Sequence, residues 1–207
     1  MSKLITASLV GAIDWAKKCP ESWKEKAMKD LANQLARRYD TPQSPQQERG
    51  RKFENFVYAK AAPQQGPIKG SEHFRWFVQE CAGGVFQKKM RKIIVVDGTE
   101  YCLYGKADAW FPDIIKDIKT TDNWRGDSHY LGGFQHKLYC YMEHISKFIY
   151  LVAEFFPGDM STIVARHSVW FTVEDFAALE KEVFDKVREV VSFLGADEKL
   201  RPLYEAF

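Results

Sequence analysis

The sequence predicts an α/β protein, with a mixed central β-sheet flanked by helices and a helical N-terminal extension. Apolar residues recur at helical spacing through the first third of the chain. The middle third changes to runs rich in Ile, Val and Tyr on either side of Asp97-Gly98, a dipeptide typical of two-residue hairpin turns. Further strand patterns and a long amphipathic helix follow, so helices and strands alternate as in an α/β sandwich.

Four helices are expected in the first third, where serine or threonine caps and proline breaks mark their ends. The first helix runs from a cap at Thr6 or Ser8 to the residue before Pro20, and the second runs from Glu21 to Tyr39. The third runs from near Gln46 to about Ala61, and the fourth runs from a cap at Ser71 to Gly83-Gly84.

Three strands are expected next, forming an antiparallel meander. A helix, two further strands and a long helix complete the chain. The three strands of the meander cover 91–96, 99–109 and 114–121. The helix that follows covers 134–144, and the two further strands cover 147–155 and 162–171. The long helix is capped by Thr172 and ended by Gly195. Gly105, Ala107 and Ala109 share the strand face opposite Asp108. Small residues there allow a helix to pack closely, which leaves the acidic face open.

Composition predicts one domain that forms its own core. The chain has 207 residues, of which 45% are hydrophobic. We divide it into a helical N-terminal part (1–45), a central core (46–172) and a C-terminal helix and tail (173–207). The net charge of +2 gives no overall attraction to nucleic acid, so such binding requires a local basic patch. The apolar stretch 4–16 is too short to span a bilayer, and no membrane association is expected.

The four cysteines are far apart and form no C-x-x-C pair. This spacing argues against a disulfide framework or a zinc ribbon and favours the reducing cytosol.

The central motif is Gly105-Lys106-Ala107-Asp108, followed nine residues after Asp108 by Asp117-Ile118-Lys119. Side chains alternate along a strand, so Asp117 and Lys119 share one face. One interpretation is a hairpin whose charges face water. It fits poorly, because neither face of 114–121 is cleanly apolar. The other interpretation is a metal site beside a phosphodiester.

Hard oxygen ligands favour Mg²⁺ or Mn²⁺. Asp108, Asp117, the Ile118 backbone carbonyl and Glu54 are the expected ligands, and the ion would lower the pKa of a bound water. Lys119 would orient that water or stabilise the hydroxide. An ion pair of Lys119 with Asp117 or Asp108 is the structural alternative, and the two roles are compatible. The reaction that suits this set is phosphodiester hydrolysis.

Further candidates surround this motif, each with a structural alternative. Gln135 and Tyr139 lie at i and i+4 on one helix face. They either contact the strand expected to bind the metal, or a DNA phosphate, or they only pack against the rest of the protein. Lys106 shares the strand face of Asp108 and either contacts phosphate or is solvated. Arg125 follows the third strand in a loop with Trp124 and His129, where a cation and an aromatic ring can meet nucleic acid or only form surface. His136, Cys140 and His144 share a helix face, but a fourth ligand is missing and no zinc is expected.

Four of these segments together resemble the PD-(D/E)XK nuclease superfamily, in its RecB-type and phage-type exonuclease branch. Gly50-x-x-x-Glu54 is similar to motif I, Gly105-x-x-Asp108 to motif II, Asp117-Ile118-Lys119 to motif III and Gln135-x-x-x-Tyr139 to the Q-x-x-x-Y signature. The resemblance spans residues 4 to about 155. It implies a restriction-endonuclease-like core in which 46–172 is catalytic.

The resemblance also implies a function. We expect a Mg²⁺- or Mn²⁺-dependent deoxyribonuclease, an exonuclease acting on DNA in recombination, repair or phage DNA processing. A recombination or single-strand-binding protein would be a partner, in the cytoplasm of a bacterial or phage-infected cell. The alternative is a non-catalytic DNA-binding or assembly module on the same fold. Strand preference, polarity and oligomeric state stay open.

Two departures from the relatives matter. Many of them carry a histidine ligand before the motif I glutamate, whereas no histidine precedes Glu54 here, so a carboxylate-based metal shell is expected. Some relatives bind an iron–sulfur cluster through C-terminal cysteines. No cysteine follows Cys140, so no cluster is expected and Cys19 is interpreted as a core thiol.

Overall fold

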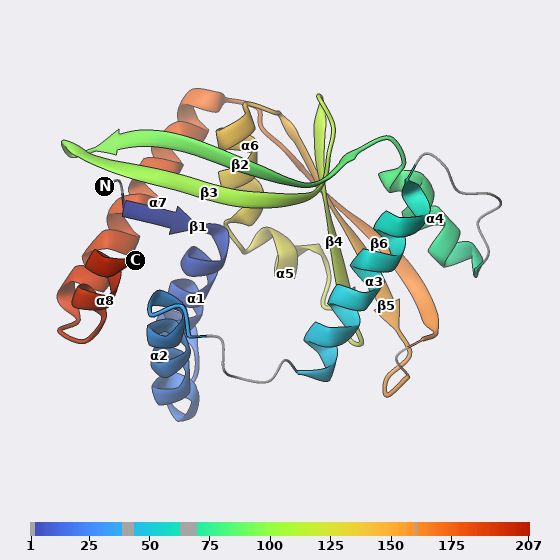
Figure 1. Cartoon of the computed structure of the whole chain (residues 1–207), viewed down its shortest axis with the longest axis horizontal. Helices are drawn as coiled ribbons and strands as arrows, with labels where there is room; N and C mark the ends of the chain where they lie inside the picture. Colours follow the sequence, from blue (N-terminus) through green and yellow to red (C-terminus); the bar gives the residue numbers. More distant parts are fainter. Residues whose placement is uncertain (1–2, 39–43, 63–69, 160) are drawn as a thin grey trace.

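The computed structural model describes residues 3–38, 44–62, 70–159 and 161–207. One mixed, six-stranded sheet runs through the molecule with helices on both faces (Figure 1). The strands are β1 (Lys3–Thr6), β2 (Val85–Val96), β3 (Thr99–Trp110), β4 (Ile114–Thr121), β5 (Lys147–Phe155) and β6 (Ile163–Thr172). The helices are α1 (Ala7–Lys18), α2 (Glu21–Leu35), α3 (Pro45–Ala61), α4 (Glu72–Cys81), α5 (Asp127–Leu131), α6 (Gln135–Glu143), α7 (Phe176–Ala196) and α8 (Leu200–Ala206).

The sheet order is β1-β3-β4-β5-β6, with β2 also paired to β3. Strand β1 runs parallel to β3, and β4 runs parallel to β5, while the remaining pairs are antiparallel. Helices α1, α2, α6, α7 and α8 contribute to one apolar core, together with residues of β2 and β3. Helices α3 and α4 contribute to a second core against β4, β5 and β6. The predicted α/β fold is confirmed.

Local sequence explains several element boundaries. Asp97 and Gly98 both have positive φ, 51° and 75°, as a two-residue hairpin turn of this kind requires. Thr6 and Ser71 cap α1 and α4 as expected, each accepting a hydrogen bond from a backbone N–H three residues on. Ser44 and Gln47 form a capping box at the start of α3. Within the described residues, no helix has the length and apolarity needed to cross a membrane.

Two expectations are wrong, one about the first third of the chain and one about the start of its long C-terminal helix. The first third is not purely helical, because Lys3–Thr6 forms β1 beside residues Tyr101–Tyr104 of β3. Four residues are too few to show a period, and their partner lies far away in sequence. Thr172 ends β6, and the cap of α7 is instead Asp175, whose carboxylate accepts from the N–H groups of Ala177 and Ala178.

The remaining differences concern strand and helix extents. Strand β2 begins at Val85, six residues before the expected start, because its polar segment 87–92 hides the strand pattern. Lys88 and Lys92 in that segment cover α6, where Lys88 pairs with Glu143 at 2.6 Å. Helix α2 ends at Leu35, and its expected end, Tyr39, lies outside the described residues. Helices α5 and α8 were not expected.

Candidate active site

Two buried carboxylates lie where β3 and β4 separate. Backbone pairing between these described strands is confined to Ala109–Lys116 and Trp110–Ile115. Beyond these pairs the carboxylate of Asp108 fills the gap, and its Oδ2 accepts a hydrogen bond of 2.8 Å from the backbone N–H of Ile118. Asp108 and Asp117 are only 8% and 2% exposed. The expectation of an open acidic face is therefore wrong, as is the alternative of charges that merely face water.

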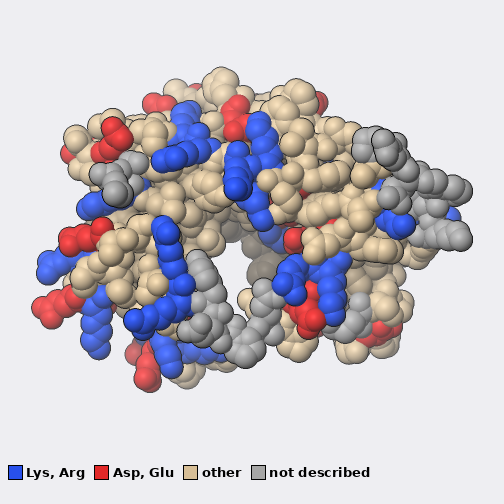
Figure 2. All heavy atoms as spheres, viewed as in Figure 1, with Lys and Arg blue, Asp and Glu red and all other residues tan. Residues whose placement is uncertain are grey.

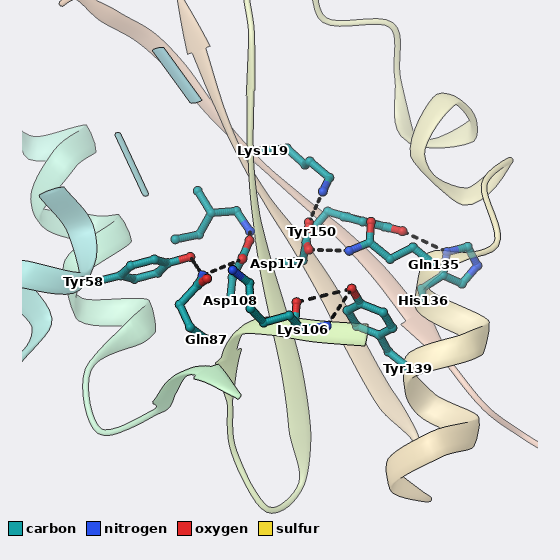
Figure 3. Close-up of polar contacts among 11 residues, drawn as sticks. Tyr58, Gln87, Lys106, Asp108, Asp117, Lys119, Gln135, His136, Tyr139 and Tyr150 are labelled. Carbon is teal, nitrogen blue, oxygen red and sulfur yellow. Dashed lines mark hydrogen bonds and ion pairs between the residues drawn. The ribbon is translucent and has the colours of Figure 1, made fainter. Parts of the chain in front are cut away.

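Asp117 is held from both sides (Figure 3). Its Oδ1 accepts a hydrogen bond of 2.6 Å from Gln135 Nε2 at the start of α6. Its Oδ2 lies 2.5 Å from Lys119 Nζ and, within the described part of the chain, accepts no hydrogen bond besides this ion pair. A buried carboxylate oxygen with only an ion-pair contact retains lone pairs for a cation.

Lys119 forms the ion pair with Asp117 that the sequence offered as its structural alternative, a contact compatible with a catalytic role. Desolvation by itself lowers the pKa of Lys119, but the carboxylates of Asp117 and then Asp108 outweigh it and raise the pKa, so the ammonium stays charged. Three adjoining hollows of about 400, 380 and 390 Å³ all include Lys119 in their linings. Lys119 therefore lies where the three hollows meet, and Glu54 lines one of them, whereas Asp108 and Asp117 line none of the three.

Helix α3 presents one stripe of residues to this junction. Gly50 lies against β4, since a Cβ there would be 3.2 Å from Thr120 Oγ1. One turn later, Glu54 shares a hollow with Ile118 and Lys119. The alternative to a site role for Glu54 is a surface ion pair with Arg51 or Lys52, its neighbours on the helix. Among the described residues no ion pair involves Glu54, and Lys52 pairs with Glu48 instead at 2.7 Å.

Two of the carboxyl groups, Glu54 and Asp108, have raised pKa values. Burial raises the pKa of Glu54, and the charge of Asp117 adds to the effect. Burial likewise raises the pKa of Asp108, followed by the charge of Asp117. Such a concentration of hard oxygen donors and negative charge fits a divalent cation. In the described part of the chain, however, no three carboxylate, histidine or cysteine side chains are close enough together to form a ready metal site.

Gln87 is a site residue that sequence analysis missed. Its φ is 54°, an unusual left-handed conformation for a residue other than glycine inside a strand. Its Nε2 lies 3.2 Å from Asp108 Oδ1 and 2.7 Å from the hydroxyl of Tyr58, the residue of α3 one turn after Glu54 (Figure 3). Counting back from the Asp97-Gly98 turn places Gln87 opposite Asp108, so the strand register predicted from the sequence already indicates that the two residues are neighbours.

Gln135 and Tyr139 take different roles. Gln135 reaches β4 directly through Asp117. The Tyr139 hydroxyl lies 3.3 Å from both the backbone N and O of Lys106. The ring passes over Gly105 so closely that a Cβ there would be 2.4 Å from Tyr139 Cε1. The predicted close packing of a helix at Gly105 is therefore found.

The basic candidates lie at the edge of the site. Lys106 is exposed and lines one of the hollows with Lys119, Gln135 and Tyr139, and its charge lowers the pKa of Glu54 in opposition to burial. Arg125 is exposed in the loop after β4. Its expected role in contacting nucleic acid stays a prediction.

The other candidate rings have partners within the protein. Trp124 stacks on His167 with ring centroids 3.9 Å apart, and it also stacks on Tyr130. His136 Nδ1 lies 3.2 Å from the Tyr150 hydroxyl, while the ring of His144 lies 4.0 Å from that of Phe176. These contacts give structural roles to residues for which base stacking or zinc binding was considered.

Comparison with known proteins relates this geometry to solved structures. Neither a protein-family model nor a curated protein sequence matches the chain. A phage-related exonuclease from Haemophilus somnus 129PT is similar in structure, with a TM-score of 0.55 and 13% identity over 100% of this chain and 95% of that chain. The alkaline exonuclease LHK-Exo from Laribacter hongkongensis has a TM-score of 0.50 and 14% identity over 91% and 88% of the two chains. At these identities the likeness establishes the fold alone: the chain has the fold of these two exonuclease structures, as its motifs lead us to expect.

Proposed function

We propose that the protein is a Mg²⁺- or Mn²⁺-dependent deoxyribonuclease, an exonuclease that hydrolyses phosphodiester bonds. The observation that carries the proposal is the placement of Asp108, Asp117 and Lys119 at one point on β3 and β4, with Glu54 facing them from α3. Burial raises the pKa values of Asp108 and Glu54, and a bound cation would stabilise their charged forms, since the Lys119 ammonium balances only part of the charge of the carboxylates.

The residues that would hold the cation are Asp108, Asp117, Glu54 and the Ile118 carbonyl. A bound divalent ion would supply Lewis acidity that activates water and offsets the charge that develops on the phosphate. The protein fixes the carboxylates beforehand: Gln135 holds Asp117, while Gln87 and the Ile118 N–H hold Asp108.

Lys119 would act on the reacting groups directly. Its ammonium lies beside a proposed ligand and within the accessible hollows, so it can orient the attacking water and stabilise negative charge. Because its pKa is raised, it acts as a hydrogen-bond donor and a charge rather than as a base in its resting state. Lys106 and Arg125 would contact phosphates of the DNA.

The biological setting that the fold favours is recombination, repair or phage DNA processing in the cytoplasm of a bacterial or phage-infected cell. A recombination or single-strand-binding protein would be the accompanying partner. Both statements derive from the likeness in fold to phage-related and alkaline exonucleases.

The test compares end-labelled linear duplex, circular duplex and single-stranded DNA, each with Mg²⁺, Mn²⁺ or excess EDTA. We expect degradation of a linear form with either metal and none with EDTA. Circular duplex should persist if the protein requires an end. Binding of DNA without cleavage under any metal condition would instead support a non-catalytic binding module on this fold.

A further inference from the structure

From Lys89 to the hairpin turn, the β2–β3 ribbon has one face with exposed side chains on which no described helix packs. Its opposite face packs on α6, where Lys88 pairs with Glu143 and Lys92 donates to the Tyr141 carbonyl oxygen. Because side chains alternate, the buried Met90 shares the face of these lysines, while Lys89 and Arg91 point the other way. In Figure 1, α6 and α7 lie behind the ribbon, and Figure 2 shows lysine and arginine side chains gathered over its front.

Four residues form what we call the ribbon face: Lys89, Arg91, Tyr104 and Lys106. Lys89 lies opposite Lys106, and Arg91 lies opposite Tyr104 in the strand register. The three cations are exposed, and among the described residues none of them forms an ion pair. Like charges directly opposite each other destabilise a sheet, so this arrangement is best explained by an anionic ligand.

The ribbon face is continuous with the candidate active site. Lys106 precedes Asp108 by two residues on the same strand face, and a hollow of about 400 Å³ is lined by both Tyr104 and Lys106 as well as Lys119. Toward the hairpin turn, the cations give way to the exposed apolar residues Ile93 and Val95. The positive charge is therefore concentrated on the part of the ribbon nearest the carboxylates.

We propose that the ribbon face binds the sugar–phosphate backbone of the DNA strand that continues away from the active site. Successive cations on one strand are two residues apart, roughly 7 Å, which sets out a row of phosphate contacts. Tyr104 adds a hydroxyl and an aromatic surface between them. The assignment rests on the proposed nuclease function for its choice of DNA as the ligand.

The test uses a Lys89→Ala/Arg91→Ala double variant, neither of whose changed residues belongs to the candidate active site. Lys181→Ala/Lys199→Ala is the matched control, since it removes two exposed cations from α7 and the segment before α8. Lys89→Arg/Arg91→Lys keeps the charge and should restore binding. Fluorescence anisotropy with labelled single-stranded and duplex DNA, in EDTA over a range of salt concentrations, measures affinity without cleavage.

We expect the ribbon double variant to bind DNA about tenfold more weakly than the parent. In a plot of log affinity against log salt concentration, the slope of the variant should be smaller in magnitude by roughly 1.5 to 2. The control and the charge-preserving variant should match the parent. With Mg²⁺, KM for long DNA should rise in the ribbon variant, while hydrolysis of a dinucleotide should be unchanged. The DNA form that shows the loss identifies which kind of strand lies on the ribbon.

The outcomes separate the two proposals. If the ribbon variant loses DNA binding and no protein cleaves DNA, the ribbon assignment stands and the proposed nuclease function fails. If the parent cleaves DNA but affinity, salt slope and KM are the same in parent and ribbon variant, the ribbon assignment is overturned while the nuclease stands. The ribbon assignment is also overturned if the parent binds neither DNA form at low salt.

Discussion

Gln87 Nε2 lies 3.2 Å from Asp108 Oδ1, and the residue that makes this contact has a φ of 54°. A residue other than glycine in the left-handed region costs about 1 to 2 kcal/mol. The conformation directs the amide toward a buried carboxylate and toward Tyr58 of α3. Backbone strain of this kind is concentrated at functional sites, which agrees with the proposed role of Asp108.

This relationship predicts a trade-off at position 87. Gln87→Gly should remove the strain and the amide together, so the free energy of unfolding should stay the same or rise by up to about 1 kcal/mol. Metal-dependent cleavage should nevertheless fall roughly 10- to 100-fold, the usual effect of losing a residue that orients a ligand. Denaturant unfolding and a Mg²⁺ titration of the rate measure the two effects. Gln87→Asn, which tolerates this φ, is the control; full activity in the glycine variant would contradict the role.

Lys119→Ala should separate chemistry from metal binding. The rate should fall by roughly 10²- to 10⁴-fold because a positioned charge beside the reacting phosphate is lost. Mn²⁺ affinity, measured calorimetrically, should be retained, since Asp108 and Asp117 remain and lose a competing cation. Cleavage at the parent rate would show that Lys119 serves only as the ion-pair partner of Asp117.

Gly105→Ala should destabilise the protein by about 1 to 3 kcal/mol. The new methyl group would meet the Tyr139 ring at 2.4 Å, and the ring is fixed by contacts to the Lys106 backbone. Gly195→Ala is the matched control, because a Cβ there meets nothing within 4 Å and alanine favours a helix. Thermal unfolding of both variants provides the measurement, and equal melting temperatures would contradict the close packing.

His136 predicts a pH dependence of stability. Burial, followed by the charge of Lys137, lowers the pKa of His136 to about 4 in the folded protein, against about 6.5 in the unfolded chain. Between these values the unfolded state binds the proton first, so stability present above pH 6.5 is lost as the pH falls to 4, by up to roughly 3 kcal/mol. In His136→Gln this part of the pH dependence should disappear from denaturant unfolding curves. His129→Gln, at an exposed ring, should leave the profile as in the parent, and an unchanged profile in both variants would contradict the assignment.

Local chemistry explains which parts of the fold were predictable. Asp97-Gly98 specifies a two-residue turn, and that turn fixes the register of the hairpin carrying Asp108. Strand β1 was not predictable, because four residues gain their structure from pairing with distant β3. The start of β2 was missed because its lysines look like a solvated segment until α6 provides their partners.

The candidate site was predictable to a similar extent. Alternation along β4 places Asp117 beside Lys119, and helical spacing places Gly50 and Glu54 on one stripe, as the structure has them. The burial of the carboxylates was not foreseen, since it depends on helices packed from both sides. For Gln87, the strand register indicates a position opposite Asp108, but the sequence does not reveal the left-handed backbone that directs its amide to Asp108.

A crystal structure with Mn²⁺ tests the position of Glu54. We expect its carboxylate within about 2.0–2.6 Å of the ion, or one water further away, together with Asp108 and Asp117. The anomalous signal of Mn²⁺ locates the ion independently of its surroundings. If the Glu54 side chain instead points into solvent, Glu54 is not a metal ligand, and the assignment of the other site residues is unaffected.

The rate of hydrolysis of end-labelled linear DNA, compared between the parent and Asp117→Asn, tests the central claim most directly. The parent should release labelled product only with Mg²⁺ or Mn²⁺. Asp117→Asn should lose both metal affinity and cleavage, because it removes a ligand charge while keeping the side-chain shape and a partner for Gln135. Cleavage by the parent in excess EDTA, or equal rates in the parent and Asp117→Asn, would contradict hydrolysis at this carboxylate site.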